Sequence, residues 1–226
     1  MQYTRTETAN SVVLTPAVPA TAAVIWLHGL GADGNDFVPI VPELQLPESL
    51  PVRFVFPHAS MRPVTINNGY VMRAWYDIKG LALSGAEDEV GIRESEHRVR
   101  DCIQRELEAG IAANKIVIAG FSQGGAIALQ TALRYPQRLA GVMALSTYLP
   151  LRTMLAAEAS KANRDVPILM CHGRQDPVVP MQLGATSRDA LKALGFAVEW
   201  QEYAMEHSVC MEEIVHIGQW LRAQLA

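Results

Sequence analysis

The sequence is poor in cysteine and contains no long apolar run. It has three cysteines in 226 residues, and their odd number and wide spacing do not suit a disulfide framework. No apolar run is long enough to span a bilayer, and residues 1–13 are polar where a signal peptide would have its apolar core. We therefore expect a cytoplasmic protein with reduced thiols and no transmembrane segment.

A strong excess of one charge is missing as well. The chain has 19 Lys and Arg against 23 Asp and Glu, a formal net charge of −4, and it has no basic run. Binding to nucleic acid or to an anionic membrane surface is therefore not expected. Because half of the residues are hydrophobic and only 19% are charged, the chain can bury a sizeable core. We interpret residues 1–226 as one domain.

Apolar stretches of strand length alternate with helical patterns along the chain. This alternation is typical of a mostly parallel sheet with helices on both faces, so we predict an α/β fold. Ligands bind to such sheets at the carboxyl ends of the strands. The predicted strands cover residues 22–27, 52–57, 115–119, 139–145, 166–171 and 198–203, and the predicted helices cover 93–110, 125–133, 180–194 and 211–225.

Residues 61–90 follow neither pattern. They mix prolines, glycines and asparagines with apolar and aromatic residues, and they show no steady period. A long irregular segment within a compact domain is usually functional or disordered, and the apolar and aromatic content argues against disorder. We predict a flap or pocket wall near the functional site. For each single residue in the segment, a role in covering an edge of the core is the alternative.

The segment Gly120-Phe121-Ser122-Gln123-Gly124 has the form G-x-S-x-G. It lies between a predicted strand and a predicted helix, a context that holds a serine on a strained turn with its hydroxyl exposed. Glycines flank such a serine because the turn leaves no room for side chains. The pattern predicts Ser122 as a nucleophile. The alternative is a glycine-rich turn with a solvated serine.

A nucleophilic serine needs a base that accepts its proton and an acid that orients the base. After a serine in this setting, the acid and then the histidine follow along the chain. Asp176 comes shortly after the predicted strand 166–171, and His207 lies between the last strand and the last helix. Asp165 would lie at the wrong end of the sheet, and no other histidine has both the order and the loop position. The sequence predicts a triad of Ser122, Asp176 and His207.

A developing oxyanion needs backbone N–H donors close to the serine. Gln123 supplies the N–H that follows the serine, and the second donor is expected from the loop after an early strand. We predict Leu30 N–H for this role, because the glycines on either side of it allow a close approach of the backbone. Residues 29–34 also match G-x-G-x-x-G, but no supporting acidic pattern accompanies them. We expect no cofactor, and no metal because the ligand motifs are absent.

Further short motifs occur in order along the chain: Leu27-His28-Gly29-Leu30-Gly31, Pro57-His58-Ala59, Arg62-Pro63-Val64-Thr65, Trp75-Tyr76-Asp77, His172-Gly173, Val179-Pro180 and His207-Ser208. With the serine segment, they make the chain similar to the small carboxylesterase and acyl-protein thioesterase family of α/β-hydrolases. The resemblance implies the α/β-hydrolase fold, the same triad and oxyanion donors, and a substrate groove formed partly by residues 61–90. The residues expected to line this groove are Trp75, Leu30, Met72, Leu81 and Val178.

The combined pattern predicts a serine carboxylesterase that hydrolyses short- to medium-chain esters through an acyl-enzyme intermediate. Hydrolysis of acyl-protein thioesters or lysophospholipids by the same triad is the alternative, because ester and thioester carbonyls present similar geometry. A noncatalytic binding module is a more distant alternative, since no triad member is missing. A dienelactone-hydrolase-like enzyme would use cysteine in place of Ser122. A homodimer is compatible with the resemblance, although no residue in the sequence requires one.

Overall fold

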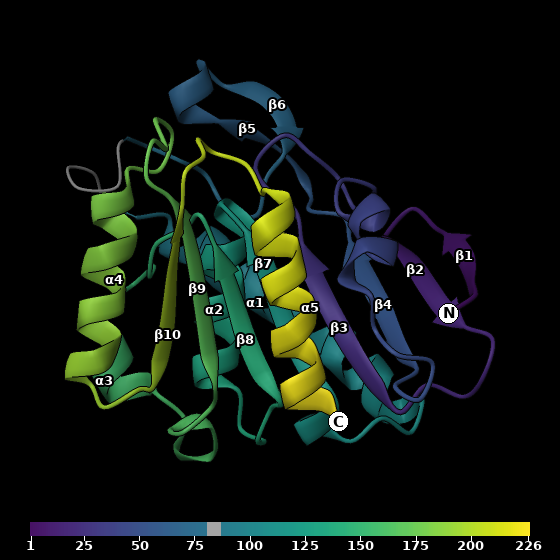
Figure 1. Cartoon of the computed structure of the whole chain (residues 1–226). Coiled ribbons are helices and arrows are strands. Elements are labelled where there is room, and N and C mark those ends of the chain that lie inside the picture. The colour runs from purple at the N-terminus through teal and green to yellow at the C-terminus, as the bar shows by residue number, and fades with distance from the viewer. Residues whose placement is uncertain (81–86) are drawn as a thin grey trace.

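Residues 1–80 and 87–226 are described by a computed structural model of the chain (Figure 1). Their main feature is an eight-stranded sheet with the order β1-β2-β4-β3-β7-β8-β9-β10. The neighbours from β4 to β10 pair in parallel, whereas β2 pairs antiparallel with both β1 and β4. The strands are Tyr3–Glu7 (β1), Ser11–Pro16 (β2), Ala22–Leu27 (β3), Val52–Pro57 (β4), Ile116–Phe121 (β7), Gly141–Leu145 (β8), Ile168–Gly173 (β9) and Val198–Tyr203 (β10). This sheet confirms the predicted fold class.

Helices cover both faces of the sheet. One face packs against α1, α2 and α4, and the other packs against α5 and the short helices of residues 38–44. Neighbouring residues of β3 illustrate this, because Ile25 belongs to one apolar cluster and Trp26 to the other. Burial on both faces explains why the central strands are continuous apolar runs in the sequence. The helices are Glu89–Glu108 (α1), Gln123–Arg134 (α2), Leu155–Glu158 (α3), Met181–Ala193 (α4) and Met211–Leu225 (α5).

The predicted strands and helices are all present, with shifts at their ends. The largest shift is at α1, which begins at Glu89 instead of residue 93. Ile92 is fully buried and extends the apolar stripe of Val99 by two turns towards the N-terminus. Gly91 lies in this added turn because a Cβ there would collide with side-chain atoms of Asp88. The sequence pattern therefore placed the start of the helix too late, because this glycine is present for packing and is untypical of a helix.

Sequence patterns missed the strands β1 and β2. They form an antiparallel hairpin that pairs with β4 at one edge of the sheet. In β2, residues with buried side chains alternate partly with less buried ones, whereas β1 is mostly exposed. An exposed edge strand carries little apolar signal, so its assignment depends on a partner that lies far away in the sequence.

The segment 61–90 is more regular than we expected. The strands β5 (Met61–Val64) and β6 (Tyr70–Arg73) form a separate antiparallel hairpin, which stands apart from the main sheet in Figure 1. Residues 74–76 are then buried, and α1 begins at Glu89. Since the segment follows the carboxyl end of β4, it lies at the edge of the sheet where ligands are expected. The predicted groove residue Leu81 lies outside the described residues.

Candidate active site

Ser122 occupies the turn between β7 and α2 in a strained backbone conformation. Its φ is 55° and its ψ is −121°, a region that costs about 1–3 kcal/mol for a residue with a side chain. A neighbouring strand holds this conformation, because Ser122 N–H donates to Leu145 O at 2.8 Å. Thr147 Oγ1 donates to Ser122 O at 2.6 Å from the same side. The turn therefore fixes the direction of the Ser122 side chain.

The glycines of the G-x-S-x-G segment are required by packing. A Cβ on Gly120 would collide with the backbone of Gly124. A Cβ on Gly124 would collide with the carbonyl oxygens of Leu27 and His28 at the end of β3. The start of α2 consequently lies directly against β3, and this contact brings the loop after β3 next to the serine.

Asp176 and His207 form a hydrogen-bonded pair at the carboxyl edge of the sheet. His207 Nδ1 lies 2.7 Å from Asp176 Oδ2. The other carboxylate oxygen of Asp176 accepts the N–H groups of Val178 at 2.9 Å and Val179 at 2.8 Å, and the carboxylate side chain has no exposed surface. A carboxylate only accepts, so His207 Nδ1 donates and the Nε2 of the neutral ring is left as a proton acceptor.

The His207 ring lies beside the serine turn. Its centroid is 4.7 Å from that of Phe121, the residue before Ser122. The loop after β3 approaches from another direction, since a Cβ on Gly29 would lie 3.6 Å from Ser122 Cβ. The structure thus gathers the predicted nucleophile, the predicted base and the predicted oxyanion loop at one edge of the sheet.

Backbone N–H groups are available at both predicted oxyanion positions. Gln123 is the first residue of α2, where N–H groups have no partner within the helix. Among the described residues, Leu30 N–H makes no hydrogen bond, whereas its neighbour Gly31 N–H donates to Arg73 O at 2.9 Å. Gln123 directly follows Ser122, and the loop of Leu30 approaches Ser122 at Gly29. Donation from these two N–H groups to an oxyanion stays a prediction.

The side chain of Gln123 has a role that sequence patterns did not indicate. It is buried, its Oε1 accepts Trp75 N–H at 2.8 Å, and its Nε2 donates to Tyr76 O at 2.7 Å. It therefore fastens residues 75–76 to the serine turn. The only sequence signal was the position of a glutamine directly after the serine.

The Trp75 side chain is buried beside the loop after β3. It is 1% exposed, and its indole N–H donates to His28 O at 2.8 Å. The buried indole satisfies its N–H within the protein and supports the loop after β3. Contact between Trp75 and a substrate stays a prediction. The motif Trp75-Tyr76-Asp77 indicated the region in which Trp75 lies but not the direction of its indole ring.

Three other predicted groove residues lie around the site. Leu30 is partly exposed on the oxyanion loop. Met72 Sδ would lie 3.7 Å from a Cβ on Gly31, which places Met72 against the same loop. Val178 is 59% exposed and follows Asp176 in the loop after β9. Contact between these side chains and a substrate stays a prediction.

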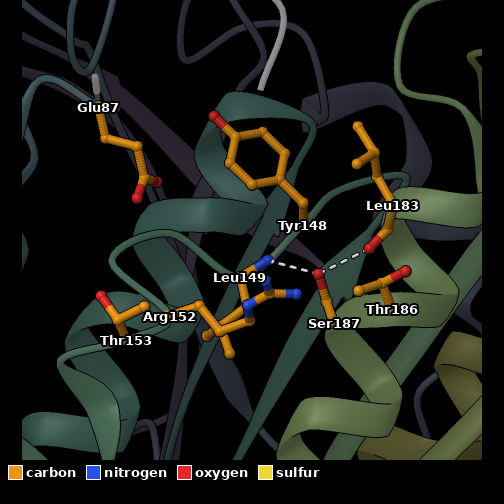
Figure 2. A pocket seen from close by; sticks show the side chains of 8 residues that line it. All are labelled: Glu87, Tyr148, Leu149, Arg152, Thr153, Leu183, Thr186 and Ser187. Atoms are coloured by element: carbon orange, nitrogen blue, oxygen red, sulfur yellow. Dashed lines mark hydrogen bonds between the residues drawn. The ribbon is translucent and has the colours of Figure 1, made fainter. Parts of the chain in front are cut away.

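Sequence patterns gave no sign of a cavity of about 150 Å³ beside the loop after β8 (Figure 2). Leu149 N–H in its wall donates to Ser187 Oγ at 2.8 Å, and this hydroxyl donates to Leu183 O at 2.7 Å. The loop that forms part of the cavity wall also contacts the serine turn, because Thr147 Oγ1 donates to Ser122 O. Its lining residues are Glu87, Tyr148, Leu149, Arg152, Thr153, Leu183, Thr186 and Ser187.

Two absences apply to residues 1–80 and 87–226. No helix in these ranges is both long enough and apolar enough to cross a membrane. Within the same ranges, no three His, Cys, Asp or Glu side chains are grouped so that they could hold a metal ion.

The parallel sheet, the strained serine at the end of β7 and the Asp176–His207 pair after later strands define an α/β-hydrolase. Residues 8–225 match the model of the phospholipase/carboxylesterase family, and the chain belongs to this family. It is accordingly a hydrolase of the esterase and thioesterase class, as the sequence motifs indicated.

Similar proteins and structures agree with this assignment. The chain is 43% identical over 223 residues to acyl-protein thioesterase 1 of Neurospora crassa, covering 94% of this chain and 91% of that protein. It is 38% identical to acyl-protein thioesterase 1 of Gibberella zeae, covering 95% of each. The crystal structure of Zea mays acyl-protein thioesterase 2 is similar with a TM-score of 0.86 at 32% identity, covering 96% of this chain and 99% of that one.

Proposed function

We propose that the protein is a serine thioesterase that removes acyl groups from cysteine side chains of acylated proteins. The observation that carries the catalytic part is the His207–Asp176 hydrogen bond of 2.7 Å beside the strained Ser122. The substrate class is supported by the curated relatives, which are named acyl-protein thioesterases at 38% to 43% identity. These relatives favour the alternative that we kept open over the carboxylesterase that we expected first.

In the first step, Ser122 Oγ attacks the thioester carbonyl carbon while His207 Nε2 accepts the hydroxyl proton. Negative charge develops on the carbonyl oxygen, where the N–H groups of Leu30 and Gln123 can donate to it. The C–S bond then breaks, and the protonated His207 gives its proton to the leaving sulfur. The acyl group is now esterified to Ser122, and the thiol has been released.

In the second step, water attacks the acyl-enzyme. His207 takes a proton from the water as the new C–O bond forms, and it returns the proton to Ser122 Oγ when the ester bond breaks. Asp176 stays ionised throughout, holds the ring by its Nδ1–H and stabilises the positive imidazolium that forms in each step. The products are a carboxylic acid and the regenerated serine.

The experiment is a comparison of two peptides with one sequence and one acyl chain, joined to cysteine in the first and to serine in the second. A thiolate is a better leaving group than an alkoxide, so we expect a higher kcat/KM for the thioester. Ser122→Ala should lower kcat on both peptides by about 10⁴-fold or more. A kcat/KM that is ten times higher for the oxyester would contradict the thioesterase assignment, and turnover that survives Ser122→Ala would contradict the mechanism.

A further inference from the structure

His28 is a buried histidine at the end of β3 whose ring contacts fix its protonation. It is 2% exposed. Its Nδ1 lies 2.7 Å from Gly29 O, which can only accept, so Nδ1 carries the proton. Ala59 N–H donates to its Nε2 at 3.0 Å, so Nε2 carries a lone pair. The ring is therefore the neutral tautomer with its proton on Nδ1.

The Gly29 carbonyl and the Leu30 N–H belong to one peptide unit. In a trans peptide the C=O and N–H bonds point in opposite directions, and this peptide is trans. By holding Gly29 O on its own side, the His28 ring turns Leu30 N–H to the other side. Leu30 N–H is left without a partner among the described residues, and a Cβ on the neighbouring Gly29 would lie 3.6 Å from Ser122 Cβ.

Neighbouring segments brace the ring and the loop. Arg73 Nη1 donates to Ala59 O at 2.9 Å, and Arg73 O accepts Gly31 N–H at 2.9 Å. Ala59 and Arg73 thus connect the far side of the His28 ring to the residue after Leu30. Gly29 O accepts from the His28 ring and, at 3.3 Å, from Ala32 N–H, and Arg73 holds the next peptide unit at Gly31.

The surroundings of His28 keep the ring neutral. Burial lowers its pKa to about 4, and the positive charge of Arg73 and the nearby His58 act in the same direction, against the Gly29 carbonyl and Asp33. A protonated ring would place an Nε2–H against Ala59 N–H, donor against donor. The hydrogen bonds described above are therefore present at neutral pH.

From this arrangement we propose that His28 is a positioning residue that aims Leu30 N–H at the transition-state oxyanion. The proposal rests on the proposed function and adds a member to its machinery that never touches the substrate. It predicts that loss of the Nδ1 hydrogen bond acts on transition-state stabilisation, because Gly29 O then keeps the longer bond from Ala32 N–H at 3.3 Å and the peptide plane is less firmly oriented. Substrate binding in the ground state depends on other contacts and should change little.

Two substitutions separate the two hydrogen bonds of the ring. Asn carries its amide nitrogen on Cγ, as His carries Nδ1, so His28→Asn keeps a donor for Gly29 O. Gln carries its amide oxygen on Cδ, close to the position of Nε2, so His28→Gln keeps only the acceptor for Ala59 N–H. We expect His28→Gln to lower kcat by about 10²- to 10³-fold with KM within threefold of wild type, the size typical of a lost oxyanion donor. His28→Asn should retain kcat within about tenfold.

A measurement on the wild type needs no variant to fold. Long-range ¹H–¹⁵N correlation spectra of the histidine rings should show His28 as the Nδ1–H tautomer from pH 5.5 to 8. An Nε2–H or protonated ring in this range would overturn the proposal. Equal losses of kcat in His28→Asn and His28→Gln, together with equal losses of Tm, would also overturn it, since only a general structural role would then remain.

Failure of this proposal is distinguishable from failure of the proposed function. If wild type hydrolyses the thioester peptide in a Ser122-dependent way and His28→Gln keeps full kcat, only the role of His28 is rejected. If wild type shows no Ser122-dependent turnover, the proposed function is rejected and the role of His28 with it.

Discussion

The serine turn and the segment that faces it are built in different ways. Around Ser122 the chain is fixed by backbone sterics, because Gly120 and Gly124 leave space where any side chain would collide with neighbouring backbone. The facing segment, residues 58–76, is fixed by single side chains that reach over to it. Gln123 holds residues 75–76, and His28 accepts a hydrogen bond from Ala59. Steric requirements leave motifs in a sequence, whereas these hydrogen bonds do not.

The largest effect is expected on the acid–base pair. Asp176→Asn keeps the size of the side chain, but its amide can donate to His207 Nδ1. The neutral ring then carries its proton on Nε2, which is the wrong tautomer for accepting the serine proton. We expect kcat to fall by about 10⁴-fold, as in other triads, while Tm changes by only a few degrees. Stopped-flow turnover of the thioester peptide gives kcat, and calorimetry gives Tm. A loss below tenfold would mean that Asp176 does not orient the base.

The steric requirement at the serine turn can be tested with Gly124→Ala. The added methyl group of Gly124→Ala would collide with two carbonyl oxygens of β3 and the residue after it, so we expect a loss of about 3 kcal/mol or more in the free energy of unfolding. The matched control is Gly80→Ala, where a Cβ would meet no atom of the described residues within 4 Å. Urea unfolding measures both. Equal stability of the two variants would show that the serine turn accommodates the methyl group and that its glycines are dispensable.

The hydrogen bonds that hold the facing segment can be tested with Gln123→Leu. Gln123→Leu leaves Trp75 N–H and Tyr76 O buried without partners, which should cost about 2 kcal/mol or more of stability. It should also raise the mobility of residues 58–76, measured as faster hydrogen exchange there than in β7. The control is the exposed Gln104→Leu on α1, expected within about 0.5 kcal/mol of wild type. Unchanged hydrogen exchange in residues 58–76 would contradict the role of the Gln123 side chain in holding residues 75–76.

The last prediction concerns the pH dependence of stability at Glu213 in the first turn of α5, a few residues after His207. Burial raises its pKa to about 8 from an ordinary value of 4.5. The folded state thus keeps a proton that the unfolded state releases, so the associated stability is fully present below about pH 4.5 and is lost as the pH rises through 8. Glu213→Gln removes this dependence. We expect the Tm of the variant relative to wild type to rise by about ten degrees between pH 5 and pH 9, and a constant difference would refute the assignment.

The comparison also explains how far the sequence predicted the molecule. Of the six predicted strands, the five from β4 to β9 in the sheet were found because they are mostly apolar on both faces. The serine turn was found because its glycines and serine are close together in the sequence. Asp176 and His207 followed from their order after the serine. The strands and the serine turn are encoded within short windows of the chain, and the order of the three triad residues can be read without knowing any contact between them.

The parts that escaped prediction depend on distant partners. The strand β1 has little apolar pattern and exists because it pairs with β2 at the sheet edge. The direction of the Trp75 ring depends on His28 O, which is 47 residues away, and the Gln123 amide reaches Tyr76 over the same separation. Such contacts can be recognised only in the assembled fold, because they join residues that are far apart in the sequence.

The central claim is that Ser122 becomes acylated during turnover. The most direct measurement mixes the protein with the S-acylated peptide, stops the reaction with acid within milliseconds to seconds, and weighs the intact chain and its peptides by mass spectrometry. The account predicts a mass increase of one acyl group on the peptide containing Ser122, at a yield matched by the released thiol, and none in Ser122→Ala. Release of thiol at the wild-type rate by Ser122→Ala would contradict it.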